Sequence, residues 1–450
     1  MHPPAHAATL LSALSGVTWP AIPSVENARM LALQYQFEQT QWWPPQQLAE
    51  MQLLQFRSVF AHALATVPYY RERFAPWSSG ISGWEQYREL PISSRAEVQQ
   101  AGTDMHSKAP PPAHGPLMKT ESSGSTGRPL LTLGSAWTQM MWHALLLRDH
   151  LWHGREFSGK LSAIRNRATP GRLDNWGSAT AVFRTGPSVV RAVSPDLDEQ
   201  LQWLADENPD YLLSLATNIH ALAERSIEVG IRLPRLKQAR TYAEMLRPDT
   251  RRLVREAWGV PLIDGYSSEE LGYMALQCPV SENYHVQSEC LIVEVLDECG
   301  GHCKPGTTGQ IVVSALHNFS MPLLRYASGD YAEVAESCSC GQGLPALRRI
   351  VGRQRNMLLN PQGGRYWPSY ASEVWRHIAP IEQIQVIQTS REDIELHVVC
   401  KRELSGSERL ELATALNLSL GFDYCVTLRR VEAIPRPRGG KYEDFICRAE

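Results

Sequence analysis

The stretch Glu121–Leu130 reads ESSGSTGRPL, and six of its ten residues are Ser, Thr or Gly. Clusters of this composition most often form plain surface turns. Backbone N–H groups of a Gly-rich turn can also converge on an anion, with flanking hydroxyls as further donors. The stretch ends in GRP instead of the GK[ST] of a Walker A loop, and Thr126 stands where a G-x-S-x-G elbow needs its Ser. A plain turn and a phosphate loop of another kind both stay open, so the rest of the chain has to decide.

The composition is that of an ordinary soluble protein, long enough for two or more domains. The 450 residues are 43% hydrophobic and 20% charged, with a formal net charge of −3. This charge gives no basic footprint for nucleic acid, and no apolar stretch reaches the length of a membrane span. The N-terminal segment lacks a basic region before its short apolar run, which argues against a secretory signal. We therefore expect a cytoplasmic protein with neither nucleic acid nor a membrane as partner.

Apolar periodicity predicts alternating helices and strands in the first 277 residues. Helical spacing follows Trp43-Pro44-Pro45 and recurs in 137–151, 197–204 and 218–229. Short apolar runs of strand type, YLLSLA and VPLIDGYSS, lie between and after these segments. Such alternation indicates an α/β core.

From Cys278 onward the pattern changes. Runs such as ECLIVEVLDECGG and GTTGQIVVSALH are rich in strand formers and broken by Gly-containing turns, which indicates a small β-rich subdomain. A polar segment at Gln354–Asn356 precedes a predicted helix at 372–378 and then alternating strand and helix patterns. We predict a hinge at 354–356, with a first domain at 1–353 and a C-terminal domain of normal size at 354–450.

Six motifs, in order along nearly the whole chain, resemble those of the adenylate-forming enzymes, which include acyl- and aryl-CoA ligases. They are SSGSTGRP at 122–129, TYAEML at 241–246, DGYSSEELG at 264–272, LLRYASGD at 323–330, IVGRQRNM at 350–357 and IPRPRGGKYEDF at 434–445. The short chain and the segment VPYYRERF at 67–74 are similar to the phenylacetate-CoA ligase and CapK-like branch. The resemblance implies an α/β fold: a large N-terminal adenylation domain of helix-flanked sheets with a β-rich subdomain, then a small mobile α+β domain that carries the catalytic Lys.

The resemblance also implies how the nucleotide is bound. The residues that would cradle the β- and γ-phosphates are Ser122, Ser123, Gly124, Ser125, Thr126 and Gly127. Glu244 would precede the adenine pocket and Tyr266 would stack on adenine. Asp330 would accept hydrogen bonds from the two ribose hydroxyls, a task that suits the paired oxygens of a carboxylate. Arg353 lies where the family places a ribose or phosphate contact.

Three residues are implied in the chemistry of ATP activation. Thr126 and Glu270 would hold Mg²⁺, and the motif spacing selects Glu270 over its neighbour Glu269. Lys441 would bridge the α-phosphate and the substrate carboxylate as a mobile point charge. Gly439 and Gly440 would give its loop the backbone freedom to move.

The nine cysteines all lie at or after Cys278, and an odd number without a signal peptide argues against a disulfide framework. Thiolates and imidazole in a closed set suit structural Zn²⁺. The set that resembles related CapK-like sequences is Cys278, His285, Cys338 and Cys340. A competing set is Cys299, His302 and Cys303, and free thiols are the third alternative.

The implied activity is ATP-dependent, AMP-forming activation of an aromatic or other small organic acid, with transfer to CoA. Transfer to an amine or to a carrier protein is the alternative within the class. Ser267 and Glu269 replace the Gly and Thr that are usual in the family, which leaves open a non-catalytic protein that binds a nucleotide or an acyl-adenylate. A homodimer also remains an open alternative.

Overall fold

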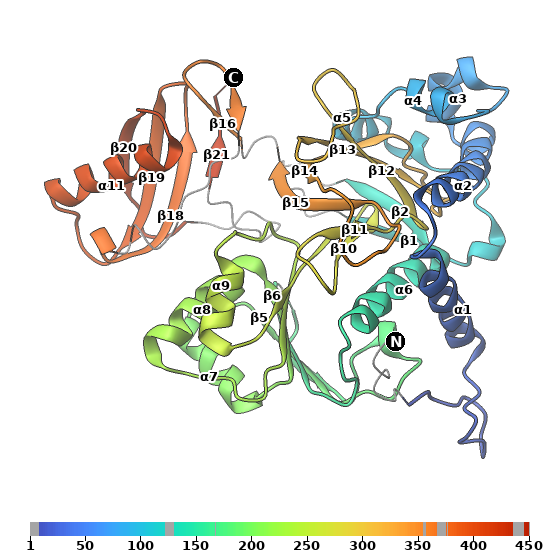
Figure 1. Cartoon of the computed structure of the whole chain (residues 1–450), viewed down its shortest axis with the longest axis horizontal. Helices are drawn as coiled ribbons and strands as arrows, with labels where there is room; N and C mark the ends of the chain where they lie inside the picture. Colours follow the sequence, from blue (N-terminus) through green and yellow to red (C-terminus); the bar gives the residue numbers. More distant parts are fainter. Residues whose placement is uncertain are drawn as a thin grey trace. The chain divides into compact units, whose positions relative to one another are not determined.

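The fold is described from a computed structural model, in residues 9–121, 130–166, 168–353, 357–366, 375, 377–434 and 445–449. These residues form two compact units, one ending at Ile350 and one beginning at Val351 (Figure 1). The predicted phosphate loop, the hinge at 354–356, most of the helix at 372–378 and Lys441 lie outside the described residues.

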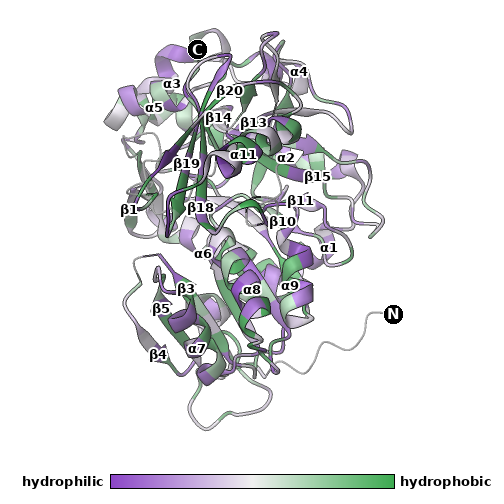
Figure 2. Cartoon of the chain, turned by 90° about the vertical axis from the view of Figure 1, so that its left-hand side faces the viewer, coloured by the Kyte–Doolittle hydropathy of each residue, from purple (hydrophilic) through white to green (hydrophobic). Residues whose placement is uncertain are grey.

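The first unit contains a six-stranded sheet in the order β4-β5-β3-β6-β7-β8, parallel except for β4. Its strands are β3 (Leu161–Arg165), β4 (Gly171–Leu173), β5 (Ser188–Ala192), β6 (Tyr211–Leu215), β7 (Gln238–Tyr242) and β8 (Leu262–Ile263). Helices α7 (Leu197–Glu207), α8 (Ala216–Val229) and α9 (Thr250–Trp258) connect them. All five residues of β6 are buried, as expected of a central parallel strand covered on both faces. In Figure 2, α8 and α9 carry hydrophobic beside hydrophilic residues, as helices with one buried face do.

A seven-stranded sheet of the same unit has the order β12-β13-β14-β15-β11-β10-β9. Its strands are β9 (Gly265–Ser268), β10 (Gly272–Gln277), β11 (Tyr284–Val286), β12 (Leu291–Leu296), β13 (Thr308–Ala315), β14 (Tyr326–Val334) and β15 (Ala346–Arg353). The described registers are antiparallel, as in a meander of short turns. A separate hairpin, β1 (Leu117–Glu121) with β2 (Leu131–Ser135), brackets the predicted phosphate loop.

Helices of the N-terminal 150 residues pack on the seven-stranded sheet and on each other. They are α1 (Val25–Thr40), α2 (Pro45–Thr66), α3 (Pro68–Arg73), α4 (Trp84–Glu89), α5 (Arg95–Ala101) and α6 (Ala136–Trp152), with 3₁₀ turns at Ala75–Trp77, Gly102–Met105 and Pro112–His114. A further 3₁₀ turn, Ser178–Thr180, precedes β5. Pro45 begins α2, where its missing N–H costs no helical hydrogen bond. Helix α6 begins directly after β2, with Ser135 and Thr138 capping each other's backbone N–H.

A buried cluster of charged residues joins α6 to the six-stranded sheet. The carboxylate of Asp149 lies 2.6 Å from Arg155 Nη1 and 3.0 Å from Arg240 Nε, and its side chain is 0% exposed. Burial tends to raise the pKa of Asp149, but the charges of Arg155 and Arg240 bring it well below its usual range. Arg240 on β7 also donates to the hydroxyl of Tyr273 on β10, at 3.1 Å. The cluster therefore ties both sheets to α6.

The second unit is built on a four-stranded sheet in the order β20-β19-β18-β21. Its elements are β16 (Leu358–Leu359), β17 (Arg365–Tyr366), β18 (Ile381–Gln388), β19 (Asp393–Cys400), α11 (Gly406–Leu420), β20 (Cys425–Arg430) and β21 (Phe445–Cys447). Gln388 attaches the β16–β17 hairpin to this sheet, because its side-chain amide both donates to and accepts from the backbone of Leu359, at 2.6 and 2.8 Å.

The expected fold class is confirmed: several sheets with helices form a mixed α/β unit, and a small α+β unit follows. The helices predicted at 137–151, 197–204 and 218–229 correspond to α6, α7 and α8. Helix α1 was not predicted, because its apolar residues follow no clear helical period and only Met30 and Phe37 are buried. Within the described residues, no helix is both long and apolar enough to cross a membrane.

Candidate active site and metal centre

Two of the predicted nucleotide-binding residues contact each other directly. The hydroxyl of Tyr266, on β9, donates to Asp330 Oδ2, on β14, at 2.7 Å. Three strands separate β9 from β14 in the sheet order, which would place them about 19 Å apart in a flat sheet. The seven-stranded sheet must therefore curl strongly, and this curvature brings two distant motifs together.

The backbone of β14 favours this position of Asp330. Gly329 has φ +82°, in the left-handed region that glycine occupies without a Cβ clash. The backbone N–H of Asp330 donates to Ser328 Oγ at 3.2 Å, and Ser328 in turn donates to the carbonyl of Ile311 on β13 at 3.2 Å. Asp330 itself is half-buried.

Glu270 lies on the turn between β9 and β10 and forms an ion pair with Arg95, the first residue of α5. Arg95 Nη1 lies 2.6 Å from Glu270 Oε1, and the two side chains are 18% and 8% exposed. Burial alone would lower the pKa of Arg95, but the hydrogen bond and charge of Glu270 raise it. The pKa of Tyr326, at the start of β14, rises to about 12, through burial first and the charge of Glu270 second, with a further contribution from Asp330. The charges of both carboxylates thus act on Tyr326.

Glu244 has a clear local function in the structure. It follows Ala243, whose φ of +65° is unusual for a residue with a Cβ. Its Oε2 accepts from the backbone N–H of Thr217 at 2.9 Å and from the Thr217 hydroxyl at 2.7 Å. Because Leu215 offers no side-chain cap, Glu244 caps the N-terminus of α8 from the segment that follows β7. The predicted position of Glu244 beside an adenine pocket stays a prediction.

The remaining predicted nucleotide contacts fall outside the described part of the first unit. Arg353 is the last residue of β15 and belongs to the second unit, whereas Tyr266, Glu270 and Asp330 belong to the first. The phosphate-loop residues 122–127 and Lys441 lie outside the described residues. Their roles stay predictions.

Sequence reasoning missed Arg95. The segment Ser94-x-x-Glu97 is a readable capping box, and the structure confirms both of its hydrogen bonds. That signal predicts a helix that begins at Arg95, but it says nothing of a carboxylate 175 residues further along the chain.

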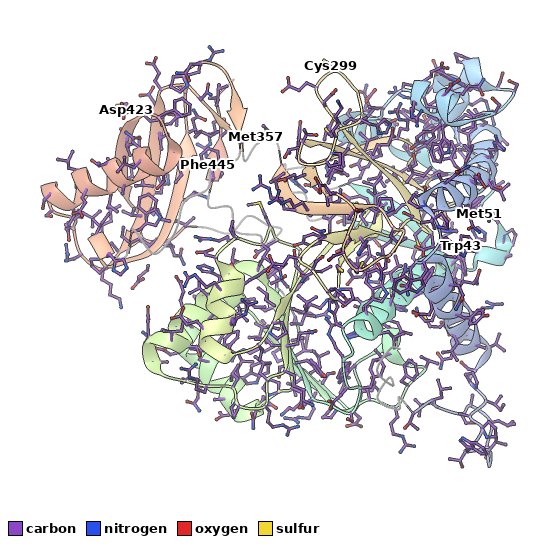
Figure 3. The ribbon with its side chains drawn as sticks, viewed as in Figure 1. Trp43, Met51, Cys299, Met357, Asp423 and Phe445 are labelled. Atoms are coloured by element: carbon purple, nitrogen blue, oxygen red, sulfur yellow. The ribbon has the colours of Figure 1, made fainter. Side chains whose placement is uncertain are left out.

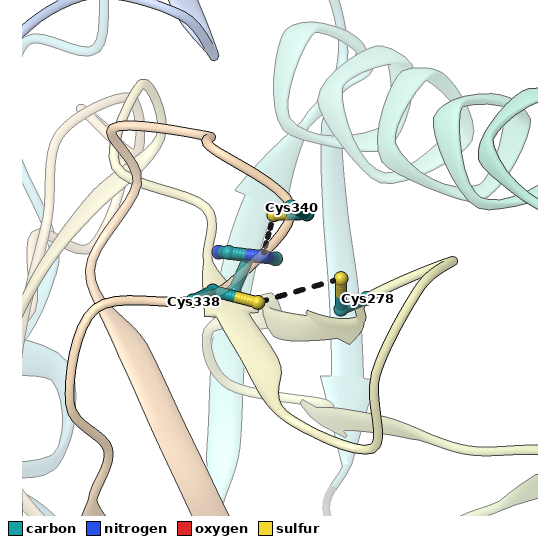
Figure 4. A group of neighbouring side chains, drawn as sticks. Cys278, Cys338 and Cys340 are labelled. Carbon is teal, nitrogen blue, oxygen red and sulfur yellow. Dashed lines mark hydrogen bonds between the residues drawn. The ribbon is translucent and has the colours of Figure 1, made fainter.

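The cluster predicted as a metal centre is assembled in the first unit (Figure 4). One ligand atom from each of four residues lies within 4.8 Å of all the others: Cys278, His285, Cys338 and Cys340. The described part of the chain holds no other such group of three or more, so the competing set of Cys299, His302 and Cys303 is not assembled. Figure 3 labels Cys299 on the loop between β12 and β13, where it is exposed.

Distances within the cluster match a tetrahedral zinc site. The Cys278 and Cys338 sulfurs are 3.6 Å apart, and His285 Nε2 is 3.2 Å from Cys340 Sγ. Zn–S bonds of 2.3 Å at tetrahedral angles would place two sulfurs about 3.8 Å apart. Cys278 follows β10, His285 lies on β11, and the other two ligands lie on the β14–β15 loop. A metal here would join two loops of the seven-stranded sheet.

Surrounding groups orient the four ligands for a metal. His285 Nδ1 lies 3.2 Å from the carbonyl of Leu344, which can only accept, so the proton belongs on Nδ1 and the lone pair on Nε2. Burial lowers the pKa of His285, which favours the neutral ring that a metal requires. Backbone N–H groups of Val280 and Gln342 point at the sulfurs of Cys278 and Cys340, at 3.4 and 3.5 Å. Burial tends to raise the pKa of the Cys338 thiol, but hydrogen bonds from Ser281 and Cys340 bring it down to about 7.

The comparison with protein families matches residues 358–448 to the CapK C-terminal domain. Two curated relatives are phenylacetate-coenzyme A ligases: that of Pseudomonas putida is 22% identical over 87% of this chain and 92% of its own length, and that of Thermus thermophilus is 24% identical over 88% and 96%. Among solved structures, 2-hydroxyisobutyryl-CoA ligase bound to R3-HIB-AMP superposes with a TM-score of 0.71 at 18% identity, over 91% of each chain.

The solved structure establishes a shared fold over both units, while the curated relatives extend the likeness to the sequence. The ordered motifs at 241–246, 264–272 and 323–330 agree with both findings. The chain is thus similar, over most of its length, to adenylate-forming ligases of the phenylacetate-CoA ligase and CapK-like branch.

Proposed function

We propose that the protein activates a small carboxylic acid as its acyl-adenylate and transfers the acyl group to CoA. The observation that carries the proposal is the Tyr266–Asp330 hydrogen bond, because it joins two of the predicted nucleotide motifs. The names of the curated relatives, both phenylacetate-coenzyme A ligases, support an aryl or similarly small acid and a CoA acceptor.

In the first step the substrate carboxylate oxygen attacks the α-phosphorus of ATP, and pyrophosphate leaves. Tyr266 stacks on adenine while Asp330 accepts hydrogen bonds from the ribose hydroxyls, so the Tyr266 hydroxyl must share or release Asp330 when the nucleotide binds. Lys441 bridges the α-phosphate and the carboxylate, where negative charge develops. The predicted phosphate-loop residues 122–127 hold the departing pyrophosphate through backbone N–H groups and hydroxyls.

Magnesium, when bound with ATP, neutralises phosphate oxygens and orients them for in-line attack. Glu270 fits this ion, because Mg²⁺ sites commonly use one or two carboxylates together with substrate phosphates, and the Arg95 ion pair engages only Oε1. Thr126 is the second proposed ligand.

In the second step the thiolate of CoA attacks the acyl carbonyl, and AMP leaves with the bonding electron pair. The C-terminal unit, residues 354–450 in our prediction, withdraws Lys441 between the two steps. Lid motions of this kind are common in multi-step enzymes.

The proposal is tested by product analysis with a panel of aryl and aliphatic acids, ATP and Mg²⁺, with and without CoA. We expect AMP and acyl-CoA in equal amounts with at least one acid, and enzyme-bound acyl-AMP when CoA is omitted. AMP formation without a thioester would instead favour an amine or a carrier thiol as acceptor. No AMP with any acid, from a protein that still binds ATP, would favour the non-catalytic alternative.

Replacement of the proposed catalytic lysine separates chemistry from binding. Lys441→Ala should abolish adenylation and leave ATP binding largely intact. Full adenylation activity in this variant would show that the role of Lys441 is wrong.

We propose in addition that Cys278, His285, Cys338 and Cys340 hold one structural Zn²⁺. The support is the closed set of four ligands within 4.8 Å and the orientation of His285 by Leu344. Because all four positions are filled by protein atoms, no open position remains for catalysis.

Metal analysis of the purified protein tests the zinc proposal. We expect about one zinc per chain, falling to near zero in Cys278→Ser and unchanged in the matched control Cys303→Ser, a half-buried thiol outside the cluster. X-ray absorption should give three sulfur ligands and one nitrogen ligand. If the purified wild type contains no metal and Cys278→Ser has the same melting temperature as the wild type, the four residues are free thiols and the zinc proposal is wrong.

A further inference from the structure

The ion pair between Glu270 and Arg95 involves the one described carboxylate that we assign to the metal. At 2.6 Å, with both side chains mostly buried, the guanidinium lies next to the position that a metal bound to Glu270 would need. A cation at that position would meet the positive charge of Arg95 at short range. The carboxylate is therefore already neutralised before any ligand arrives.

Arg95 is held in place by several independent contacts. Ser94 caps α5 directly before it. The backbone of Ser93 donates to the carbonyl of Arg325 and accepts from the N–H of Ala327, both at 2.9 Å, so this segment lies against the start of β14. Two residues further along α5, Glu97 pairs with Arg73 of α3 at 2.9 Å. Arg95 is thus placed by the same strand that carries Asp330.

Glu270, in contrast, lies on a turn. The turn is held by the backbone N–H of Leu271, which donates to Ser268 Oγ at 3.2 Å, and by Gly272, whose φ is +79°. An ion pair between a helix residue and a turn residue holds the carboxylate in one orientation without filling both of its oxygens.

We propose that Arg95 acts as an internal cation that keeps divalent metal off Glu270 until the nucleotide arrives. The triphosphate brings enough negative charge to accept both Arg95 and the metal, so the metal enters together with ATP. Arg95 is then a positioning residue: it holds Glu270 in the nucleotide-free protein and sets the order of binding. This inference rests on the proposed role of Glu270 as a metal ligand.

The test is a Mn²⁺ titration of the full-length, zinc-loaded protein in the absence of nucleotide, followed by electron paramagnetic resonance. The wild type should show no Mn²⁺ site that depends on Glu270. Arg95→Gln should gain such a site, with Mn²⁺ affinity at least about tenfold higher than in the wild type, because the competing charge is removed. Adding Glu270→Gln to this variant should abolish the gain.

Two further variants act as controls. Arg95→Lys keeps the charge and should stay without the site. Arg73→Gln breaks the neighbouring ion pair between Arg73 and Glu97, whose N–O distance of 2.9 Å is comparable to the 2.6 Å of the Arg95–Glu270 pair. This variant should bind Mn²⁺ as the wild type does. Circular dichroism confirms that each variant is folded, and the wild-type titration tests the proposal even if Arg95→Gln does not fold.

A Glu270-dependent Mn²⁺ site in the nucleotide-free wild type would overturn the inference, as would a folded Arg95→Gln protein with no gain in affinity. Neither result bears on acyl-AMP formation by the wild type, which is measured separately. Loss of that activity would remove the proposed function, whereas the titration alone decides the role of Arg95.

Discussion

Asp149 and Glu270 are both carboxylates within ion-pair distance of arginine, yet their surroundings differ. Asp149 is 0% exposed between Arg155 and Arg240, in the core that joins α6 to both sheets. Glu270 has Arg95 on one oxygen and lies on the turn between β9 and β10, four residues after Tyr266. The number of partners and the depth of burial separate a carboxylate that holds the fold from one that can exchange its partner for a ligand.

The largest expected effect comes from removing the fixed carboxylate. Asp149→Asn leaves two buried guanidinium groups without their counter-charge, and we expect a loss of about 3–5 kcal/mol in the free energy of unfolding. Urea denaturation measures it. Asp198→Asn, which breaks an exposed pair with Arg225, is the matched control and should have a much smaller effect. Equal effects in the two variants would contradict the distinction.

The next largest effect is expected at Asp330, the carboxylate that we propose to bind the ribose hydroxyls. Asp330→Ala should raise the KM for ATP about 10- to 100-fold, since hydrogen bonds to a charged group contribute about 1.5–3 kcal/mol. The midpoint of urea denaturation should change little, because Asp330 is only half-buried. A large loss of stability with an unchanged KM would reassign Asp330 to the fold.

The surroundings of Asp149 also predict how stability depends on pH. Burial lowers the pKa of His153 to about 4, despite the opposing charge of Asp149. Between about pH 6.5 and pH 4 the unfolded chain holds a proton at His153 that the folded chain does not, so stability falls as pH falls, by about 3 kcal/mol across the whole window.

Denaturation at pH 7 and pH 5 measures this slope. His153→Gln keeps a donor for the carbonyl of Gln277, which lies 3.2 Å from His153 Nε2, and should flatten the slope. Identical slopes in the variant and the wild type would place the proton uptake elsewhere.

The smallest effect is expected at the exchangeable partner of Asp330. Tyr266→Phe keeps the aromatic ring for adenine and removes only the hydroxyl that occupies Asp330 Oδ2. Because the ribose takes over that oxygen in our account, the KM for ATP should change by less than about threefold. A loss as large as that of Asp330→Ala would mean that the hydroxyl is needed in the bound state.

The sequence predicts the fold well where motif and periodicity act locally. Apolar spacing predicts α6, α7 and α8, and two residues picked from the strings DGYSSEELG and LLRYASGD, Tyr266 and Asp330, contact each other in the structure. The metal cluster is also readable as a set of Cys and His, although the sequence alone leaves a competing set open.

What the sequence does not reveal are contacts made between distant segments. Arg95 meets Glu270 only because Ser93 joins β14, and Glu244 caps α8 only because β6 and β7 are neighbours. Even Arg325, within a predicted nucleotide motif, is buried against Glu294, with Arg325 Nε and Glu294 Oε2 3.0 Å apart, and supports the fold. Such roles depend on three-dimensional neighbours that no local pattern encodes.

The most direct test of the account is acid-dependent exchange of labelled pyrophosphate into ATP, with Mg²⁺ and a panel of aryl and aliphatic acids. We predict exchange that requires one class of acid, is lost in Lys441→Ala and is weakened at low ATP in Asp330→Ala. Absence of exchange with every acid, in a folded wild-type protein that binds ATP, would contradict adenylation and direct attention to Ser267 and Glu269.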